Sequence, residues 1–211
     1  MTLYKWTYHK TGTVLLRGIL ERVGELTEDI AKASKGVHCV RHPFEIVASG
    51  YKYHKRCDYE EWLVTPNEWD MRNLSAKSNI YKEILNELDQ HDGILFEIHN
   101  AAQDAIRKMS KEYIVAKSDP RFLSIRLEDM STNFKGTCRM IAEHLEVDPI
   151  KFLEIASPFD KNREGYFSKH VTNPARRPHT YSMLLDDFHK CEILSLDTNV
   201  WEFMKEYDYE W

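Results

Sequence analysis

The sequence is poor in cysteine, and its few cysteines lie far apart. The 211 residues include four cysteines, at positions 39, 57, 138 and 191, and no two of them form a CxxC pair. This spacing suggests neither a zinc cage nor a disulfide framework, and reduced thiols are the rule in the cytosol. We therefore expect a cytoplasmic protein.

Basic charge and long apolar runs are also scarce. The formal net charge is −5, which argues against a nucleic-acid-binding protein that relies on a broad basic face. No run approaches the length needed to cross a bilayer, and a strand pattern already at Tyr4 leaves no room for a cleavable leader. Neither a nucleic acid nor a membrane span is indicated.

Linker-like stretches rich in proline, glycine or serine are absent as well. Hydrophobic residues make up 42% of the chain, enough at this length to bury a sizeable core. The sequence thus favours a single domain over residues 1–211. Histidines and acids, such as His42, His54 and the acids at 58–61, do not follow a zinc-binding pattern, so we expect no metal.

The chain begins with a pattern that is typical of an anion-binding turn. A short β-type run leads into a polar turn over residues 9–13, and apolar residues then recur at helical spacing. Backbone N–H groups at a helix N-terminus lack partners within the helix and carry the positive end of its dipole. Gly12 allows close approach, Lys10 adds a positive charge, and Thr11 and Thr13 add hydroxyl donors. The turn is therefore a candidate site for a phosphate or sulfuryl group.

A second motif follows the next strand pattern. Residues 36–40 form an apolar run that ends in Arg41, and Pro43 then stands where a helix favours its first residue. Ser49 follows on that helix. Arginine binds phosphate in a bidentate manner, although an arginine that pairs with a structural acid is the alternative reading.

The remaining periodicity predicts more helices around a sheet. Two helices are expected between residues 80 and 109, covering the sheet, and Asp148 with Pro149 predicts the start of another. A third strand is expected at 122–127, a helix from 134 to 145, and helical structure again from Tyr181. The predicted class is α/β, with a three-layer, mostly parallel sheet flanked by helices and a P-loop-like nucleotide-binding topology.

Together, the Lys-x-Gly-Thr turn and the Arg-x-Pro…Ser segment resemble the sulfotransferases that use 3′-phosphoadenosine 5′-phosphosulfate (PAPS). The Arg-x-Glu-Asp segment at 126–129 resembles the same family. The resemblance implies that Lys10 contacts the bridging oxygen and sulfuryl group of PAPS. It also implies that Thr11, Gly12 and Thr13 hold the 5′-phosphate. Val14, also a cofactor-binding candidate, stands where the family often has a second threonine.

By the same resemblance, Arg41 and Ser49 clamp the 3′-phosphate of PAPS and of its product, 3′-phosphoadenosine 5′-phosphate (PAP). Residues 157–180 form an irregular segment in which basic residues outnumber acids. Its Arg176 and Arg177 resemble a late basic loop that reaches this phosphate in the family. A tryptophan- and acid-rich segment at 57–69 is expected to form a structured loop over the site.

Sulfuryl transfer also needs a base that takes the proton of the acceptor. Many family members place a histidine on a strand between the two motifs, and this chain is too short there to contain that strand. His9 and His54 are the preferred candidates for the base, followed by Glu97 and His99.

The leading hypothesis is a sulfotransferase that moves a sulfuryl group from PAPS to a hydroxyl or amine acceptor. The acceptor is expected to be a small molecule, a glycan or a lipid. One alternative is a P-loop-type nucleotide kinase, although the chain contains no GxxxxGK[ST] motif. Another is a catalytically inactive regulatory protein that binds PAP.

Overall fold

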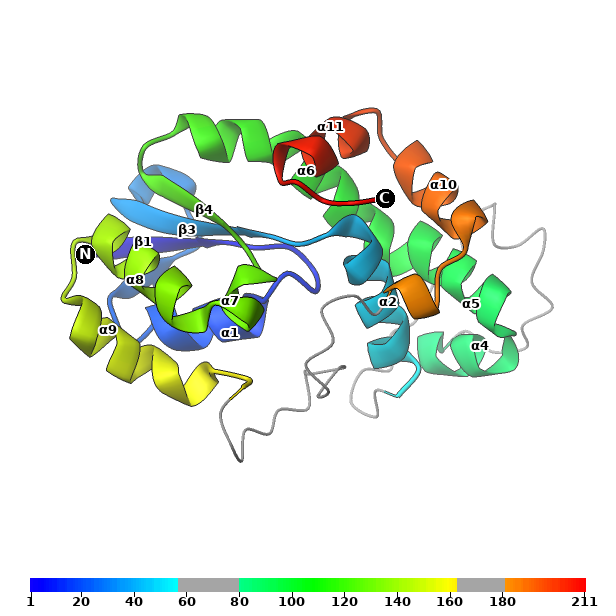
Figure 1. Cartoon of the computed structure of the whole chain (residues 1–211), viewed down its shortest axis with the longest axis horizontal. Helices are drawn as coiled ribbons and strands as arrows, with labels where there is room; N and C mark the ends of the chain where they lie inside the picture. The colour runs from blue at the N-terminus through cyan, green and yellow to red at the C-terminus, as the bar shows by residue number, and fades with distance from the viewer. Residues whose placement is uncertain (57–79, 163–180) are drawn as a thin grey trace. The chain divides into compact units, whose positions relative to one another are not determined.

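The computed structural model describes residues 1–56, 80–162 and 181–211 (Figure 1). Contacts within the chain divide it into two compact units, and each unit combines two separate stretches. The first consists of Met1–Arg41 and Lys111–Pro178, and the second of His42–Ser110 and His179–Trp211. That the whole chain forms one domain stays a prediction.

The first unit contains a parallel sheet. In the described residues it has four strands: β1 (Thr2–Trp6), β2 (Glu25–Thr27), β3 (Lys35–Val40) and β4 (Phe122–Arg126). Their order across the sheet is β2-β1-β3-β4, and every neighbouring pair is parallel. Parallel neighbours need crossover connections, so after each strand the chain must cross back to the end of the sheet where that strand began.

One face of this sheet carries the apolar core of the first unit. Leu3, Val37 and Ile125 are fully or almost fully buried there with the apolar side chains of α1 (Thr13–Leu20) and α8 (Phe134–Leu145). In Figure 1 these two helices lie on the same side of the strands. Three further segments follow β4 or α8: α7 (Asp129–Thr132), α9 (Pro149–Ala156) and the 3-10 turn η3 (Ser157–Phe159).

The opposite face of the sheet is aromatic and partly polar. Trp6, His38 and Phe122 project to this side, and the Trp6 ring lies edge-on to both others, at centroid distances of 5.3 Å. The helix α6 (Gln103–Ser118) places Glu112 here, where its Oε2 accepts a hydrogen bond from Trp6 Nε1 at 2.9 Å. Helices thus flank the sheet on both faces, which confirms the predicted three-layer α/β class.

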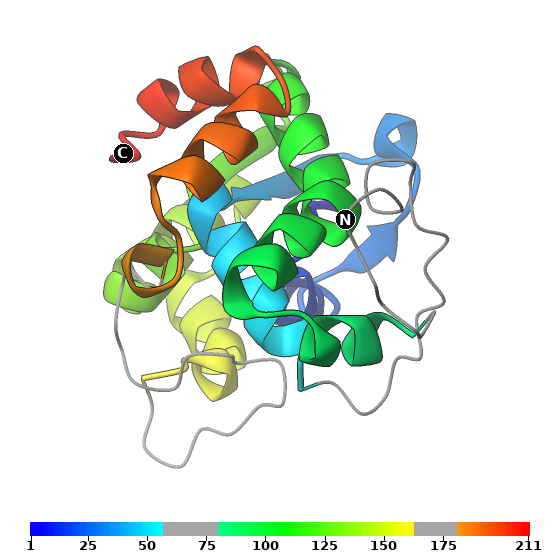
Figure 2. The same ribbon diagram turned by 90° about the vertical axis from the view of Figure 1, so that its right-hand side faces the viewer.

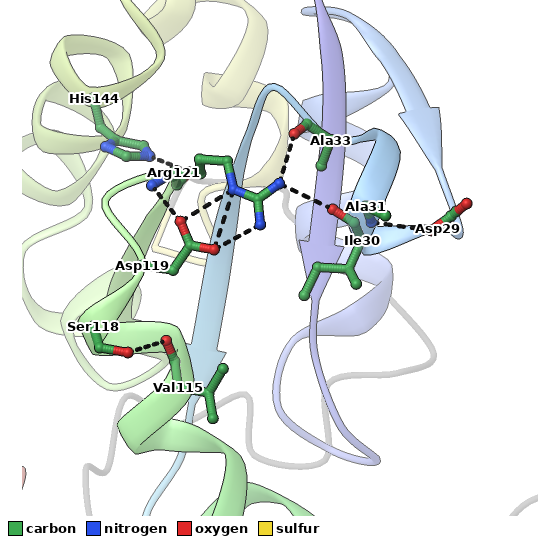
Figure 3. Close-up of polar contacts among 9 residues, drawn as sticks. All are labelled: Asp29, Ile30, Ala31, Ala33, Val115, Ser118, Asp119, Arg121 and His144. Atoms are coloured by element: carbon green, nitrogen blue, oxygen red, sulfur yellow. Dashed lines mark hydrogen bonds and ion pairs between the residues drawn. The ribbon is translucent and has the colours of Figure 1, made fainter.

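The start of β4 is fixed by Arg121 (Figure 3). Its guanidinium forms hydrogen bonds with both carboxylate oxygens of Asp119 and donates to the carbonyls of Ile30 and Ala33. These two carbonyls belong to the 3-10 turn η1 (Ile30–Lys32) and to the residue after it. The same guanidinium lowers the pKa of the Asp119 carboxyl, mainly through the side-chain hydrogen bond. One arginine therefore joins the entrance of β4 to the segment that leads into β3.

The second unit is helical in its described residues. Its elements are α2 (Pro43–His54), α4 (Tyr81–Glu87), α5 (Gln90–Glu97), the π-helical turn η2 (Ile98–Ala102), the first half of α6, the 3-10 turn η4 (Tyr181–Met183), α10 (Asp187–Ser195) and α11 (Asn199–Glu206). Helices α2, α5 and α10 pack against one another, as Figure 2 shows. At the start of α2, His42 Nδ1 accepts from the backbone N–H of Phe44, and Pro43 takes the first helical position.

The structure differs from the sequence expectation in two places. The polar stretch from Glu25 to Lys35 contains the edge strand β2, which the sequence did not predict because three residues carry no usable periodicity. The long helix expected from 94 to 109 is interrupted by η2. The predicted capping by Asp148 is confirmed, since its carboxylate accepts from the N–H groups of Ile150 and Lys151.

The helices at 81–87 and 90–102 belong to the second unit, so their covering of the sheet stays a prediction. Across the described stretches, every helix is too short or too polar to span a lipid bilayer.

Candidate functional site

The turn between β1 and α1 is held together by its own threonines. The Thr11 hydroxyl accepts from the backbone N–H of Tyr8 at 2.7 Å and donates to the Tyr8 carbonyl at 3.0 Å. The Thr13 hydroxyl lies 3.0 Å from both the Tyr8 carbonyl and Thr7 Oγ1. Thr11 is fully buried, so its hydroxyl organises the turn. A direct contact of the two threonines with a phosphate stays a prediction.

Two residues of this turn adopt left-handed backbone conformations. Lys10 has φ 61°, which is uncommon for a residue other than glycine, and Gly12 has φ 86°. A Cβ on Gly12 would also lie 2.8 Å from Leu127 Cδ1, so glycine is required there. A left-handed Gly12 followed by helical Thr13 turns successive backbone N–H groups toward one side, an arrangement that binds anions. Within the described residues, no side-chain hydrogen bond caps α1 at Gly12.

Arg41 lies close to the turn. Its Nη1 donates to the carbonyl of Lys10 at 2.9 Å, and the side chain is partly buried. The structure therefore brings together the predicted Lys10 and Arg41, which follow the adjacent parallel strands β1 and β3 in the chain. Ser49 is buried on α2 in the second unit, so a phosphate shared by Arg41 and Ser49 stays a prediction.

His54 and Glu97 form a buried pair in the second unit. The distance between His54 Nδ1 and Glu97 Oε2 is 2.8 Å, and the two side chains are 4% and 0% exposed. Tyr81 donates its hydroxyl to the same carboxylate oxygen at 2.9 Å. The backbone of Gly50 packs directly against Oε1, since a Cβ at this position would overlap it. The carboxylate therefore fixes Nδ1 as the protonated nitrogen of His54 and makes Nε2 the nitrogen with the lone pair.

The sequence did not reveal a buried polar chain beside the turn. Tyr8 donates its hydroxyl to Glu112 at 3.1 Å, so His38 Nε2–H donates to the Tyr8 oxygen, also at 3.1 Å. His38 Nδ1 then accepts from the Ser124 hydroxyl, 2.9 Å away. Burial lowers the pKa of His38 to about 3, so its ring is neutral at pH 7. In the sequence, the sign of this hydrogen-bonded network was His38, a polar residue within the apolar run 36–40.

The other predicted site residues differ in their burial and partners. His9 is partly buried and Val14 is 54% exposed. His99 pairs with Glu192 at 3.1 Å within the second unit, which gives it a structural partner. Arg176 and Arg177, and the predicted loop at 57–69, lie outside the described residues.

No protein-family model matches the chain, and the sequence of no curated protein matches it. Among solved structures, the fold is similar to that of the mouse sulfotransferase SULT7A1 complexed with PAP. The TM-score is 0.55 at 15% sequence identity, and the match covers 99% of this chain and 88% of that chain. At this identity the likeness shows the fold, a parallel sheet flanked by helices as in a sulfotransferase.

Proposed function

We propose that this protein is a sulfotransferase that uses PAPS as the sulfuryl donor. The observation that carries the proposal is the turn after β1, where Gly12 is left-handed, α1 starts without a side-chain cap, and Arg41 holds the Lys10 carbonyl. Such a turn suits the 5′-phosphate of a nucleotide. The similarity to the fold of a sulfotransferase supports the same conclusion.

The residues present fit PAP and PAPS as ligands. Backbone N–H groups at the start of α1 would hold the 5′-phosphate, and the Lys10 ammonium would meet the phosphosulfate. Arg41 donates from Nη1 to the Lys10 carbonyl and so lies beside the turn, and a guanidinium group suits the 3′-phosphate. In the proposal, Ser49 donates to this phosphate as well, and Arg176 and Arg177 add positive charge.

His54 is the proposed general base. Because Glu97 accepts from Nδ1–H, Nε2 would be the nitrogen that takes the proton of an acceptor hydroxyl or amine. The buried carboxylate also stabilises the imidazolium that forms when this proton arrives. Glu97 and Tyr81 are thus proposed as positioning residues, because they act through His54. His9 stays an alternative base.

In the proposed reaction, the acceptor oxygen or nitrogen forms a bond to sulfur, while the bond from sulfur to the bridging phosphate oxygen breaks. The acceptor proton goes to His54, and the electron pair of the broken bond stays on PAP. Negative charge grows on that oxygen during the transfer, so a fixed ammonium at Lys10 stabilises the transition state more than the ground state. The acceptor would be a small molecule, a glycan or a lipid.

Ligand-induced thermal stabilisation tests the proposal. We expect PAP to raise the melting temperature without any divalent metal, because mass action stabilises the state that binds the ligand. ADP, which lacks the 3′-phosphate, should raise it less. A larger shift with ATP and magnesium than with PAP would refute the proposal and favour a nucleotide kinase. Turnover is measured separately, with labelled PAPS and a panel of phenols, alcohols and amines. PAP binding without turnover on this panel would favour a PAP-binding regulatory protein.

A further inference from the structure

A cluster of metal-ligating side chains lies in the helical unit, on residues that the proposed sulfuryl transfer does not use. His91 on α5, Asp186 at the N-cap of α10 and His189 in the first turn of α10 each offer one ligand atom. These three atoms all lie within 4.8 Å of one another. No local sequence pattern predicts the cluster, because His91 and His189 are 98 residues apart.

The distances suit a small tetrahedral ion. His91 Nδ1 lies 3.4 Å from Asp186 Oδ2, and His189 Nδ1 lies 2.8 Å from Asp186 Oδ1. Ligand atoms around a zinc ion with bonds of roughly 2.0–2.2 Å are about 3.3 Å apart. The two distances lie on either side of this value and run to different oxygens of Asp186, so binding to one ion requires rotations of these side chains.

The second nitrogen of His189 is already arranged as in a metal ligand. His189 Nε2 lies 3.2 Å from the carbonyl of His91, to which it donates its proton. Its Nδ1 therefore carries the lone pair, which accepts from the backbone N–H of Asp186 at 3.3 Å, and a bound ion would replace this hydrogen bond. A histidine that binds a metal commonly donates its other ring N–H to a carbonyl or carboxylate, which fixes tautomer and orientation.

Helix capping accounts for the contacts between Asp186 and His189, and His91 adds a pair with the Asp186 carboxylate that the cap does not need. Asp186 accepts from the backbone N–H of His189, and His189 Nδ1 accepts from the backbone N–H of Asp186, which together form a capping box. The ring of His91 takes no part in this capping box. The centroid of that ring lies 4.5 Å from the centroid of the His189 ring, with the two planes tilted by 52°, and its Nδ1 lies 3.4 Å from Asp186 Oδ2.

We propose that His91, Asp186 and His189 bind a divalent transition-metal ion of the zinc class, with water in a fourth position. Two imidazoles and one carboxylate are a ligand set that such ions favour. His189 is 2% exposed, whereas His91 and Asp186 are about half exposed, so the ion would be open to solvent on one side. The bound ion would link α5 to α10 and stabilise the helical unit. This inference does not rest on the proposed sulfotransferase activity.

Calorimetric titration of the full chain with zinc chloride, after removal of metals by a chelator, tests the site. We expect one zinc ion per chain with a Kd of about 10 µM or tighter. His91→Ala removes one ligand from an exposed position, and Asp186→Asn removes the charge but keeps a residue that caps helices well. Each variant should weaken zinc binding by at least about tenfold.

His99→Gln is the matched control. His99 also pairs with a carboxylate in the same unit, at 3.1 Å from Glu192, and belongs to no three-ligand cluster found in the described residues. The His99→Gln variant should bind zinc with the same affinity as the wild type. Circular dichroism of each metal-free variant verifies folding, and the visible absorption of the cobalt form reports the coordination number. Absence of saturable binding up to about 100 µM zinc would overturn the proposal. So would an unchanged affinity in His91→Ala.

Discussion

Arg41 donates a hydrogen bond from Nη1 to the backbone carbonyl of Lys10, at 2.9 Å. The residue after β3 thus holds the turn after β1, and it does so at a residue with a left-handed backbone. In the proposal, this guanidinium has two roles: it supports the backbone of the turn, and it binds the 3′-phosphate of the ligand. The first two predictions separate these roles.

We expect Arg41→Ala to weaken PAP binding by about 2–4 kcal/mol, the cost of removing one partner of a desolvated charge pair. ADP lacks the 3′-phosphate, so its binding should fall by only about 1 kcal/mol, through the lost support of the Lys10 carbonyl. Isothermal titration with both nucleotides measures the difference. Equal losses for PAP and ADP would show that Arg41 acts on the turn alone.

Lys10→Met keeps the side-chain stem and removes the charge. If Lys10 stabilises charge that develops on the leaving oxygen, turnover with labelled PAPS should fall by roughly a hundredfold or more, and PAP affinity much less. Lys10→Gly is a useful companion, because glycine adopts the left-handed conformation without strain while the charge is again lost. Normal turnover in either variant would remove Lys10 from the chemistry.

The pair of His54 and Glu97 makes a kinetic prediction. Glu97→Gln preserves size and can still accept a hydrogen bond, but it no longer stabilises an imidazolium, so kcat should fall by about ten- to a hundredfold. His54→Gln should lower kcat further, because it removes the proposed base itself. Tyr81→Phe, which removes one donor to Glu97, should have the smallest effect. A kcat in His54→Gln close to that of the wild type would assign the base to another residue, with His9 the next to test.

His38 makes a prediction about stability and pH. Its pKa is lowered from 6.5 to about 3 by burial, so the folded state holds this ring neutral while the unfolded state protonates it. Below pH 6.5 the unfolded state therefore binds more protons, and the free energy of unfolding should decrease as the pH falls toward 3. The contribution of this one group is at most about 1.4 kcal/mol per pH unit.

Denaturant unfolding of the wild type and of His38→Gln between pH 7 and pH 4 measures this contribution as the difference between the two slopes. Proton NMR of the histidine ring gives a second readout that does not depend on the variant's folding. A His38 resonance that titrates near pH 6.5 would contradict a neutral buried ring.

The sequence by itself determined the local elements that carry the site. The polar turn at 9–13 lies between β1 and α1 as predicted, and the run that ends in Arg41 is β3. Pro43 opens α2, and the predicted third strand is β4. These elements depend on side-chain periodicity, on glycine, and on capping residues, which act over a few neighbouring positions and are therefore visible in the sequence.

The tertiary structure alone decided which distant side chains meet. Glu97 lies 43 residues beyond His54, and Glu112 lies 104 residues beyond Tyr8. No local pattern encodes such a pairing, because it depends on the register of the strands and on how helices pack in three dimensions. For the same reason, sequence reasoning treated Glu97 and His54 as rival bases, whereas packing joins them into one buried pair with a separate role for each.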